Sequence, residues 1–297
     1  MRSVEYLKSQ GVDVDQSLDI FGDISTYNSS IGEFTAGVTE KIKKMETYKA
    51  SKDIKNYGIY AHSLKSDAKF FGFTKLSDLA AEMETKSNEN DWFYIDENYK
   101  TLADEANKSL EVIKEYMNGT DDVAAPVETP VEPAPAEAAP TEAAPAEAAP
   151  AEAAPAEAPK PASNAVVYDK RTILVVDDSN IIRNFVKRIF SEEYEVGTAK
   201  DGQEAIDILE ANKDNDFIET ILLDLNMPRV DGFAVLDYMQ ENGLLSKFPV
   251  SIISGDSSKE TIDKAFNYQI VDMLSKPFNE QSVKNVIEKT LIYKGMD

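Results

Sequence analysis

The chain has 297 residues, of which 42% are hydrophobic, and its 54 acidic and 31 basic side chains give a formal net charge of −23. This charge disfavours binding to a nucleic-acid backbone. The chain has no cysteine, so disulfides and thiol chemistry are excluded. Its N-terminus lacks the apolar core of a signal peptide, and no apolar run reaches the roughly 20 residues that span a bilayer. We therefore expect a soluble, cytoplasmic protein that has no nucleic-acid or membrane partner and binds proteins or small ions.

The first 120 residues are predicted to be entirely helical. Ser25 is expected to cap the first long helix, and either Ser51 or Asp53 the second. In the second helix, apolar residues recur three and four positions apart, as in one buried stripe, and Gly72 is expected to end it. The predicted helices cover about residues 25–48, 54–71, 76–83 and 96–117. Such helices, joined by short loops, predict an all-α antiparallel four-helix bundle as the domain 1–120.

Residues 121–169 form a region of different composition, in which the pattern AEAAP repeats between Ala124 and Pro161. Prolines at this spacing remove helical hydrogen-bond donors and clash with the preceding turn. The repeat has no aromatic residue and almost nothing to bury, so we expect a disordered linker rich in Ala, Glu and Pro. Two domains joined in this way can meet, but need not.

Residues 170–297 change to an alternation of strand and helix patterns. Short apolar runs typical of buried strands lie at residues 172–176, 194–199, 219–223, 250–254 and 272–275. Helical patterns follow them at residues 179–190, 202–211, 232–240, 258–268 and 280–293. These alternating units predict an α/β doubly wound domain with a parallel sheet and helices on both of its faces.

Polar residues gather where the predicted strands end. Asp177 and Asp178 follow the first strand, Asp224 the third, Ser254 ends the fourth and Lys276 follows the fifth. In an open parallel sheet these positions share one edge, where ligands bind. Carboxylates packed together repel unless a cation balances them. Mg²⁺, which prefers oxygen ligands, suits this set better than zinc, because the region contains no cysteine or histidine.

Four blocks in this region, ILVVDDS, LLDLNMPRVDGF, SIISGD and LSKPF, resemble the signature blocks of response-regulator receiver domains in both order and spacing. The resemblance implies a CheY-like, flavodoxin-like (βα)5 fold for residues 170–297. It also implies that Asp224 is the phosphoacceptor, so that the chain is a phosphoprotein carrying a phosphoaspartate. Phosphoryl transfer needs mainly positioning and charge neutralisation, which agrees with a lysine and a metal ion beside a single attacking carboxylate.

The resemblance implies a role for each neighbour of this aspartate. Lys276 would steady the phosphoryl oxygens and precede a cis proline, and Ser254 would hydrogen-bond the phosphoaspartate and move the loop after it. The implied Mg²⁺ ligands are Asp178, Asp224 and the backbone carbonyl of Asn226, with Asp177 supporting the ion or its waters. One position departs from the family. Met273 stands where an aromatic residue is usual, so we predict no aromatic switch there.

His62 is the only histidine in the chain and lies beside the apolar stripe of its predicted helix. Lys65 and Lys69, at +3 and +7, fall on the same side and would stabilise an added phosphoryl charge. The segment AHSLKSDAKFFG resembles the histidine phosphotransfer (HPt) motif, and the resemblance extends over residues 1–118. It implies that His62 becomes a phosphohistidine. Ser66 replaces the usual glycine at +4, and either narrows a partner's approach or adds a hydrogen bond.

The two resemblances together imply a protein of phosphorelay signal transduction in a two-component system. No GxxxxGK[ST] motif is present, so we expect no ATP-dependent kinase and no enzyme beyond a receiver that catalyses its own phosphorylation and dephosphorylation. The phosphoryl group would come from a histidine kinase or from other receiver or HPt proteins. No DNA-binding motif follows the receiver, so the expected output is protein binding or onward transfer.

Three hypotheses remain open from the sequence. His62 and Asp224 exchange phosphate within one chain, or the two ends serve different partners and the protein is a scaffold or phosphate sink. The third hypothesis is a Mg²⁺-dependent phosphohydrolase with Asp224 as nucleophile. It is disfavoured because such enzymes need a second acidic residue just behind the nucleophile, where this chain has Leu225 and Asn226.

Overall fold

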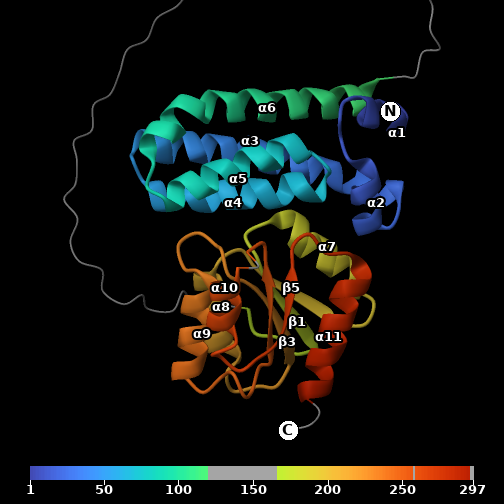
Figure 1. The fold of residues 1–297 in the computed structure, drawn as a ribbon. Coiled ribbons are helices and arrows are strands. Elements are labelled where there is room, and N and C mark those ends of the chain that lie inside the picture. Colours follow the sequence, from blue (N-terminus) through green and yellow to red (C-terminus); the bar gives the residue numbers. More distant parts are fainter. Residues whose placement is uncertain (120–165, 257, 295–297) are drawn as a thin grey trace, which may run out of the picture.

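The computed structural model describes residues 1–119, 166–256 and 258–294, which form a helical layer stacked on an α/β layer (Figure 1). The predicted linker, residues 121–169, lies outside the described residues except for its last four. Within the described ranges, no helix is both long enough and apolar enough to cross a bilayer.

Residues 1–119 are helical, as predicted, and contain two short helices ahead of four longer ones. These helices are α1 (Val4–Ser9), α2 (Val14–Phe21), α3 (Ile24–Ala50), α4 (Ile54–Phe70), α5 (Thr74–Asn88) and α6 (Trp92–Asn118). The long helices α3 to α6 lie side by side as the predicted bundle, while α1 and α2 close one end of it (Figure 1). The two short helices were not predicted from the sequence.

The caps of the long helices differ in part from the prediction. Asp23, not Ser25, caps α3, because its Oδ1 accepts a hydrogen bond from the amide of Thr26 at 2.9 Å. A carboxylate at this position also interacts favourably with the helix dipole. Asp53 caps α4 as expected. Helix α6 begins at Trp92, earlier than predicted, behind a cap at Asp91. Its first turn was not predicted because its first residues are aromatic and have low helix propensity.

The C-terminal region is a five-stranded parallel sheet in the order β2-β1-β3-β4-β5. Its strands are β1 (Thr172–Val176), β2 (Glu195–Ala199), β3 (Ile218–Asp224), β4 (Val250–Ser254) and β5 (Ile270–Ser275). All five were predicted to within two residues. Their carboxyl ends point toward the helical bundle (Figure 1). The edge of the sheet at which ligands bind therefore faces the other domain.

Five helices cover the two faces of this sheet, which confirms the doubly wound fold. They are α7 (Asn180–Phe190), α8 (Gly202–Asn212), α9 (Gly232–Glu241), α10 (Lys259–Ala265) and α11 (Glu280–Lys294). Helices α8, α9 and α10 bury apolar side chains in one core, and α7 and α11 do so in another. Helix α10 is shorter than the predicted 258–268, because the chain turns after Ala265.

The core under α7 and α11 continues into the core of the helical bundle. One cluster of buried apolar side chains contains Leu64 and Phe70 of α4 together with Phe185 of α7 and Val283 of α11. The two domains thus pack against each other through an apolar interface. The polar carboxyl edge of the sheet lies next to this interface.

Candidate phosphotransfer site

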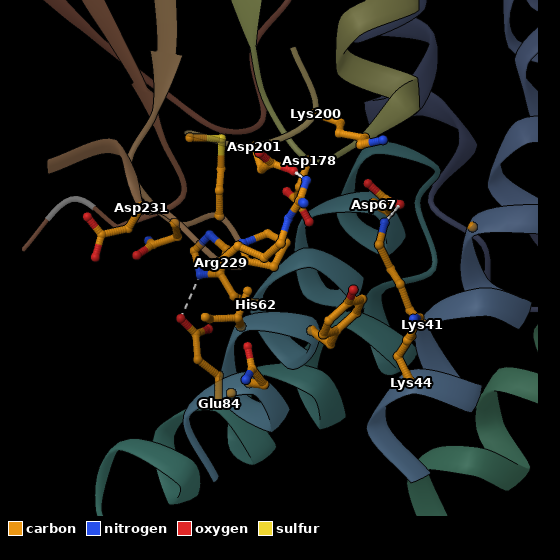
Figure 2. A pocket seen from close by; sticks show the side chains of 18 of the residues that line it. Lys41, Lys44, His62, Asp67, Glu84, Asp178, Lys200, Asp201, Arg229 and Asp231 are labelled. Atoms are coloured by element: carbon orange, nitrogen blue, oxygen red, sulfur yellow. Dashed lines mark hydrogen bonds and ion pairs between the residues drawn. The ribbon is translucent and has the colours of Figure 1, made fainter. Parts of the chain in front are cut away.

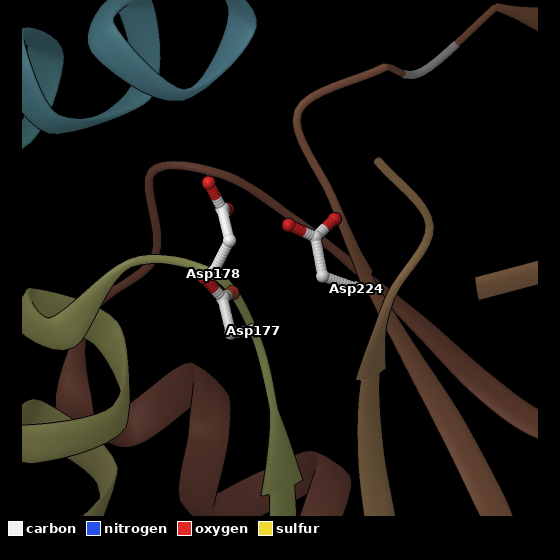
Figure 3. Close-up of side chains that lie close together, drawn as sticks. All are labelled: Asp177, Asp178 and Asp224. Carbon is white, nitrogen blue, oxygen red and sulfur yellow. The ribbon is translucent and has the colours of Figure 1, made fainter. Parts of the chain in front are cut away.

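Three carboxylates lie together at the carboxyl edge of the sheet (Figure 3). Val176 pairs with Leu223 in the register of β1 and β3, so the residues that follow them, Asp177 and Asp224, come to lie side by side. Asp178 is the next residue after Asp177 and is half-buried, whereas the other two are fully buried. One oxygen from each carboxylate lies within 4.8 Å of the others. We call these three residues the acidic rim.

Lys276 brings a positive charge into the acidic rim from the end of β5. Its Nζ lies 2.7 Å from Oδ2 of Asp177 and 2.6 Å from Oδ2 of Asp224. Burial by itself would lower the pKa of Lys276, but the nearby carboxylates outweigh burial and raise that pKa, so the side chain stays an ammonium. The peptide bond between Lys276 and Pro277 is cis, as the resemblance implied.

The acidic rim has the properties that a hard divalent cation requires. Burial, together with the charges of Asp224 and Asp178, raises the pKa of Asp177 despite its ion pair with Lys276. Three carboxylates facing one ammonium leave negative charge to be balanced, and every side-chain donor in the rim is an oxygen. Oxygen ligands and carboxylate charge are what Mg²⁺ selects. The residues present therefore fit the Mg²⁺ that the resemblance to receiver domains implied.

The other predicted residues of this edge are also close by. Ser254 is fully buried at the end of β4, and its Oγ accepts a hydrogen bond from the amide of Asp256 at 3.0 Å. The amide of Asn226 donates to Oδ1 of Asp224 at 3.2 Å. Met273 packs into the core beneath α8, α9 and α10, so its side chain is part of that apolar packing.

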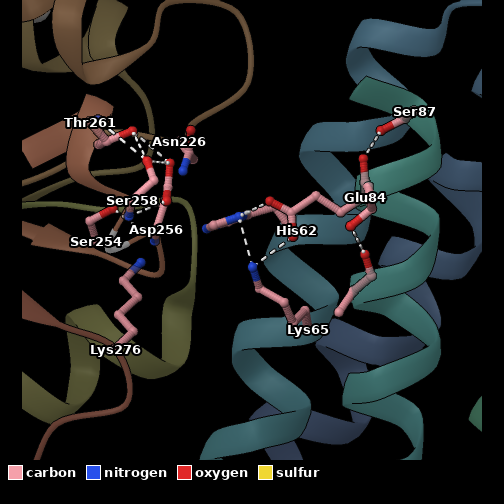
Figure 4. A network of polar contacts seen from close by, with 12 residues as sticks. His62, Lys65, Glu84, Ser87, Asn226, Ser254, Asp256, Ser258, Thr261 and Lys276 are labelled. Carbon is pink, nitrogen blue, oxygen red and sulfur yellow. Dashed lines mark hydrogen bonds and ion pairs between the residues drawn. The ribbon is translucent and has the colours of Figure 1, made fainter. Parts of the chain in front are cut away.

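His62 is held by a carboxylate from the neighbouring helix α5. Its Nδ1 lies 2.6 Å from Oε1 of Glu84, and the other oxygen of Glu84 accepts from Nζ of Lys65 at 2.6 Å (Figure 4). Lys65 is also 3.4 Å from Nδ1, but the much shorter contact makes Glu84 the partner of this nitrogen. An ionised carboxylate only accepts hydrogen bonds. Nδ1 therefore carries the ring proton and, in the neutral ring, Nε2 keeps a free lone pair.

Glu84 was not identified from the sequence. Burial opposes its ionisation, but the hydrogen bond and charge of His62, with those of Lys65, outweigh burial and lower the pKa of Glu84. Helix α5 carries several acidic residues, and no sequence signal separates the one that faces α4 from those that face solvent. Only the packing of the two helices identifies it.

The remaining predicted residues of α4 lie on either side of this pair. Lys69 is exposed and lines a small crevice that also contains Lys276 and Pro277, so it stands between the two domains. The hydroxyl of Ser66 is buried, with no hydrogen-bond partner among the described residues. Of the two sequence hypotheses for Ser66, the structure therefore favours a steric role.

The imidazole of His62 faces the sheet domain rather than solvent. His62 is only 2% exposed, because the sheet domain covers it. The sequence had instead favoured an exposed histidine. Figure 4 shows the ring directed toward the loop that contains Ser254 and Asp256. Beside it a cleft of about 1050 Å³ opens between the domains, with His62 and Glu84 on one wall and Asp178 and Arg229 on the other (Figure 2).

Comparisons with known proteins match both parts of the chain. Residues 173–288 match the response regulator receiver domain, and residues 30–116 match the Hpt domain. The chemotaxis protein CheY1 of Helicobacter pylori is 30% identical over 121 residues, which are 40% of this chain and 95% of that protein. The two-component response regulator ORR3 of Oryza sativa subsp. indica is 27% identical over 121 residues, 40% of this chain and 90% of that protein.

A solved structure of the chemotaxis protein CheY4 of Vibrio cholerae is 27% identical and has a TM-score of 0.38, covering 41% of this chain and 100% of that one. The two matched regions follow each other in the same order as the helical bundle and the sheet domain.

Proposed function

Because the chain belongs to the response regulator receiver family and carries an Hpt domain ahead of its receiver domain, we propose that it is a phosphorelay protein that holds a phosphoryl group on His62 and on Asp224. We assign residues 1–120 to the Hpt domain, 121–169 to a linker and 170–297 to the receiver domain. Phosphorelay signalling follows from the two domains, and the roles of individual residues below are part of the proposal.

What most favours this function is the position of Lys276. Its ammonium touches Asp224 at 2.6 Å and Asp177 at 2.7 Å, next to the third carboxylate of the acidic rim. A phosphoryl group on Asp224 would lie next to that ammonium. Ser254, at the end of the neighbouring strand β4, would donate a hydrogen bond from its hydroxyl to the phosphoryl group. Charge neutralisation and positioning are what phosphoryl transfer needs.

Mg²⁺ is the proposed cofactor of the receiver domain. Asp177, Asp178, Asp224 and the carbonyl of Asn226 would hold the ion, which supplies positive charge for the phosphoryl oxygens when it is bound. The protein's own contribution is to hold Asp224 beside the ammonium of Lys276 and away from bulk water, so that a carboxylate oxygen is placed to attack phosphorus.

In the Hpt domain, Nε2 of His62 is the proposed nucleophile. Glu84 fixes the ring proton on Nδ1, and Lys65 anchors Glu84. When Nε2 takes a phosphoryl group the ring becomes positively charged, and the carboxylate of Glu84 balances that charge. Lys65 and Lys69 are proposed to support the phosphoryl group. Both line the interface crevice, and Lys65 is also engaged with Glu84.

The proposed partners are a histidine kinase and other receiver or HPt proteins, because the sequence offers no nucleotide-binding motif. We class the protein as a signalling protein of the cytoplasm that transfers phosphate, not as an enzyme with turnover. A scaffold or phosphate sink whose two ends serve different partners is the main alternative. The phosphohydrolase hypothesis is weaker, since Leu225 behind Asp224 is buried and apolar and offers no acid.

The experiment that tests this function maps phosphate on the full chain. Incubation with acetyl phosphate and Mg²⁺ should place a hydroxylamine-sensitive phosphate on Asp224, which is absent in Asp224→Asn. A cognate kinase or receiver should place an acid-labile, base-stable phosphate on His62, which is absent in His62→Gln. If Asp224→Asn retains the acyl phosphate, the assignment is wrong. Rapid turnover of generic phosphate esters would favour the hydrolase.

A further inference from the structure

We propose that the direct phosphotransfer partner of His62 is the receiver domain of its own chain, docked as the structure shows. This inference rests on the proposed function and adds to it the identity of the partner. It selects one of the hypotheses that the sequence left open. Four features of the interface between the two domains support it: the position of the histidine, an aromatic contact, a buried polar bridge and a glycine beside the histidine.

The first feature is the buried and unpartnered Nε2 of His62. This atom has no hydrogen-bond partner among the described residues and is buried beneath the receiver domain. An unpaired polar atom in such a place is costly, so it indicates a function rather than packing. The loop after β4, between Ser254 and Asp256, lies beside this atom (Figure 4). The nucleophilic nitrogen thus already lies against the loop of the phosphoacceptor site.

The second feature is an aromatic contact that both domains share. Phe70 of α4 packs edge-on against Phe278 of the receiver domain, with ring centroids 5.4 Å apart. Phe185 of α7 packs against Phe70 at 6.3 Å and against Phe21 of α2 at 6.0 Å. All four rings are buried. Edge-to-face packing of buried aromatics is among the stronger apolar contacts, so the contact of these four rings favours a stable interface between the two domains.

The third feature is a polar bridge inside the interface. The hydroxyl of Ser179, which caps α7, donates to Oδ1 of Asp67 of α4 at 2.7 Å. Asp67 is 1% exposed and forms an ion pair with the buried Lys41 of α3. Buried charged groups require partners, and the receiver domain supplies one of the two partners of this carboxylate. A second bridge, from Asn184 to Glu33 at 2.9 Å, lies at the edge.

The fourth feature is Gly255, whose backbone lies directly beside His62. A Cβ placed on Gly255 would lie 3.0 Å from both Cε1 and Nε2 of His62 and 3.3 Å from Oγ of Ser66. These three nearest atoms all belong to the bundle, and none belongs to the receiver domain. The absence of a side chain at Gly255 therefore allows the close approach of His62, and a larger residue there would obstruct docking because its Cβ first meets the bundle.

The transfer balances without an added reactant. The lone pair of Nε2 attacks the phosphorus atom of the acyl phosphate on Asp224, and an N–P bond forms. The P–O bond to Asp224 breaks, and its electron pair stays on the carboxylate beside Lys276. The proton on Nδ1 remains on the ring, hydrogen-bonded to Glu84. The reverse step returns the group to Asp224 by the same path. Because both domains are on one chain, docking is unimolecular.

The test follows the phosphoryl group in the full chain. The wild-type protein is phosphorylated on Asp224 with acetyl phosphate and Mg²⁺, the donor is removed, and phosphohistidine is measured over time. We expect a first-order rate that is unchanged over about a hundredfold dilution. Mixing His62→Gln chains with Asp224→Asn chains restores both groups only in separate molecules, so transfer should be slow and should depend on concentration.

Gly255→Val provides the second arm of the test, because the atoms nearest to an added Cβ belong to His62 and Ser66 of the bundle. We expect phosphorylation of Asp224 by acetyl phosphate to stay within about twofold of wild type, while transfer to His62 falls at least about tenfold. Gly32→Val is the matched control, since a Cβ on Gly32 meets nothing within 4 Å, and it should transfer at the wild-type rate.

The outcomes separate the two ideas. If Asp224 accepts phosphate but transfer slows in proportion to dilution, or if Gly255→Val transfers as fast as wild type, the intramolecular partner is wrong and the phosphorelay function stands. If acetyl phosphate leaves Asp224 unmodified in the wild-type chain, the proposed function fails, and the inference fails with it.

Discussion

Oε1 of Glu84 lies 2.6 Å from Nδ1 of His62, on the side of the ring opposite to Nε2. The carboxylate is on α5 and the histidine on α4, so the reactive state of the ring depends on how two helices of the bundle pack. A second oxygen of the same carboxylate holds Lys65. This pair explains how a histidine covered by another domain keeps one nitrogen ready for chemistry.

Replacing Glu84 should change the tautomer of His62. In Glu84→Leu the Nδ1 proton loses its acceptor, so we expect a mixture of ring tautomers and a loss of about ten- to hundredfold in the rate of phosphoryl transfer to His62. Glu84→Gln keeps an acceptor and should lose less. Nitrogen-15 NMR of the ring is unambiguous because the chain has one histidine. An unchanged tautomer in Glu84→Leu would contradict the role.

Acid should remove the contribution of Glu84 to the stability of the bundle. Because its pKa is lowered in the folded state, this contribution is complete above the ordinary glutamate pKa of about 4.3 and declines as pH falls from there through the folded value. Trp92, the only tryptophan, packs near Tyr57 of the bundle and reports its unfolding. Urea unfolding should show a lower free energy of unfolding for Glu84→Gln than for wild type at neutral pH, and this difference should disappear below about pH 4. A difference that does not change with pH would contradict the lowered pKa of Glu84.

Removing the ammonium of Lys276 should destabilise the receiver domain. Lys276→Met leaves Asp177 and Asp224 buried without their cation, so we expect a loss of about 3 kcal/mol in the free energy of unfolding at neutral pH, together with loss of phosphorylation at Asp224. Lys289→Met is the control, because Lys289 pairs with Asp272 while well exposed, and such pairs contribute about 1 kcal/mol or less. Calorimetry measures both, and equal losses would refute the assignment.

Mg²⁺ should stabilise the receiver domain through the acidic rim. A ligand that binds only the folded state at a hundred times its Kd stabilises it by about 2.7 kcal/mol, so we expect MgCl2 to raise the Tm and a chelator to reverse the change. Asp178→Asn should weaken the effect, because Asp178 is the half-buried carboxylate of the rim. NaCl at equal ionic strength is the control. An equal rise in Asp178→Asn would show that the ion binds elsewhere.

A crosslink should report the docked arrangement directly. The chain has no cysteine, so Glu33→Cys with Asn184→Cys creates a single thiol pair where the native side chains meet at 2.9 Å. We expect a short bis-maleimide to join the two residues within one chain at a rate that dilution does not change. Glu33→Cys with Glu241→Cys is the control, because α9 ends at the edge of the sheet opposite the strand carboxyl ends. Equal crosslinking of both pairs would contradict docking.

The sequence by itself determined the four long helices of the bundle, the strands and helices of the sheet domain, and the residues of the acidic rim; the short helices α1 and α2 were missed. Strand and helix patterns are local, and parallel strands bring their carboxyl ends to one edge whatever the rest of the chain does. The order of the strand patterns is therefore enough to place Asp177, Asp178, Asp224, Ser254 and Lys276 together. The exceptions were local too: Asp23 rather than Ser25 as a cap, and an aromatic start that hid the first turn of α6.

Only the tertiary structure decided which residue holds His62 and what His62 faces. Glu84 is 22 positions away on another helix, and the faces that α4 and α5 turn toward each other depend on packing along their whole length. The contacts of Phe70 with Phe278 and of Asp67 with Ser179 join residues that are far apart in the chain. Periodicity describes one element at a time, and these contacts depend on shapes and charges that exist only after both domains have folded.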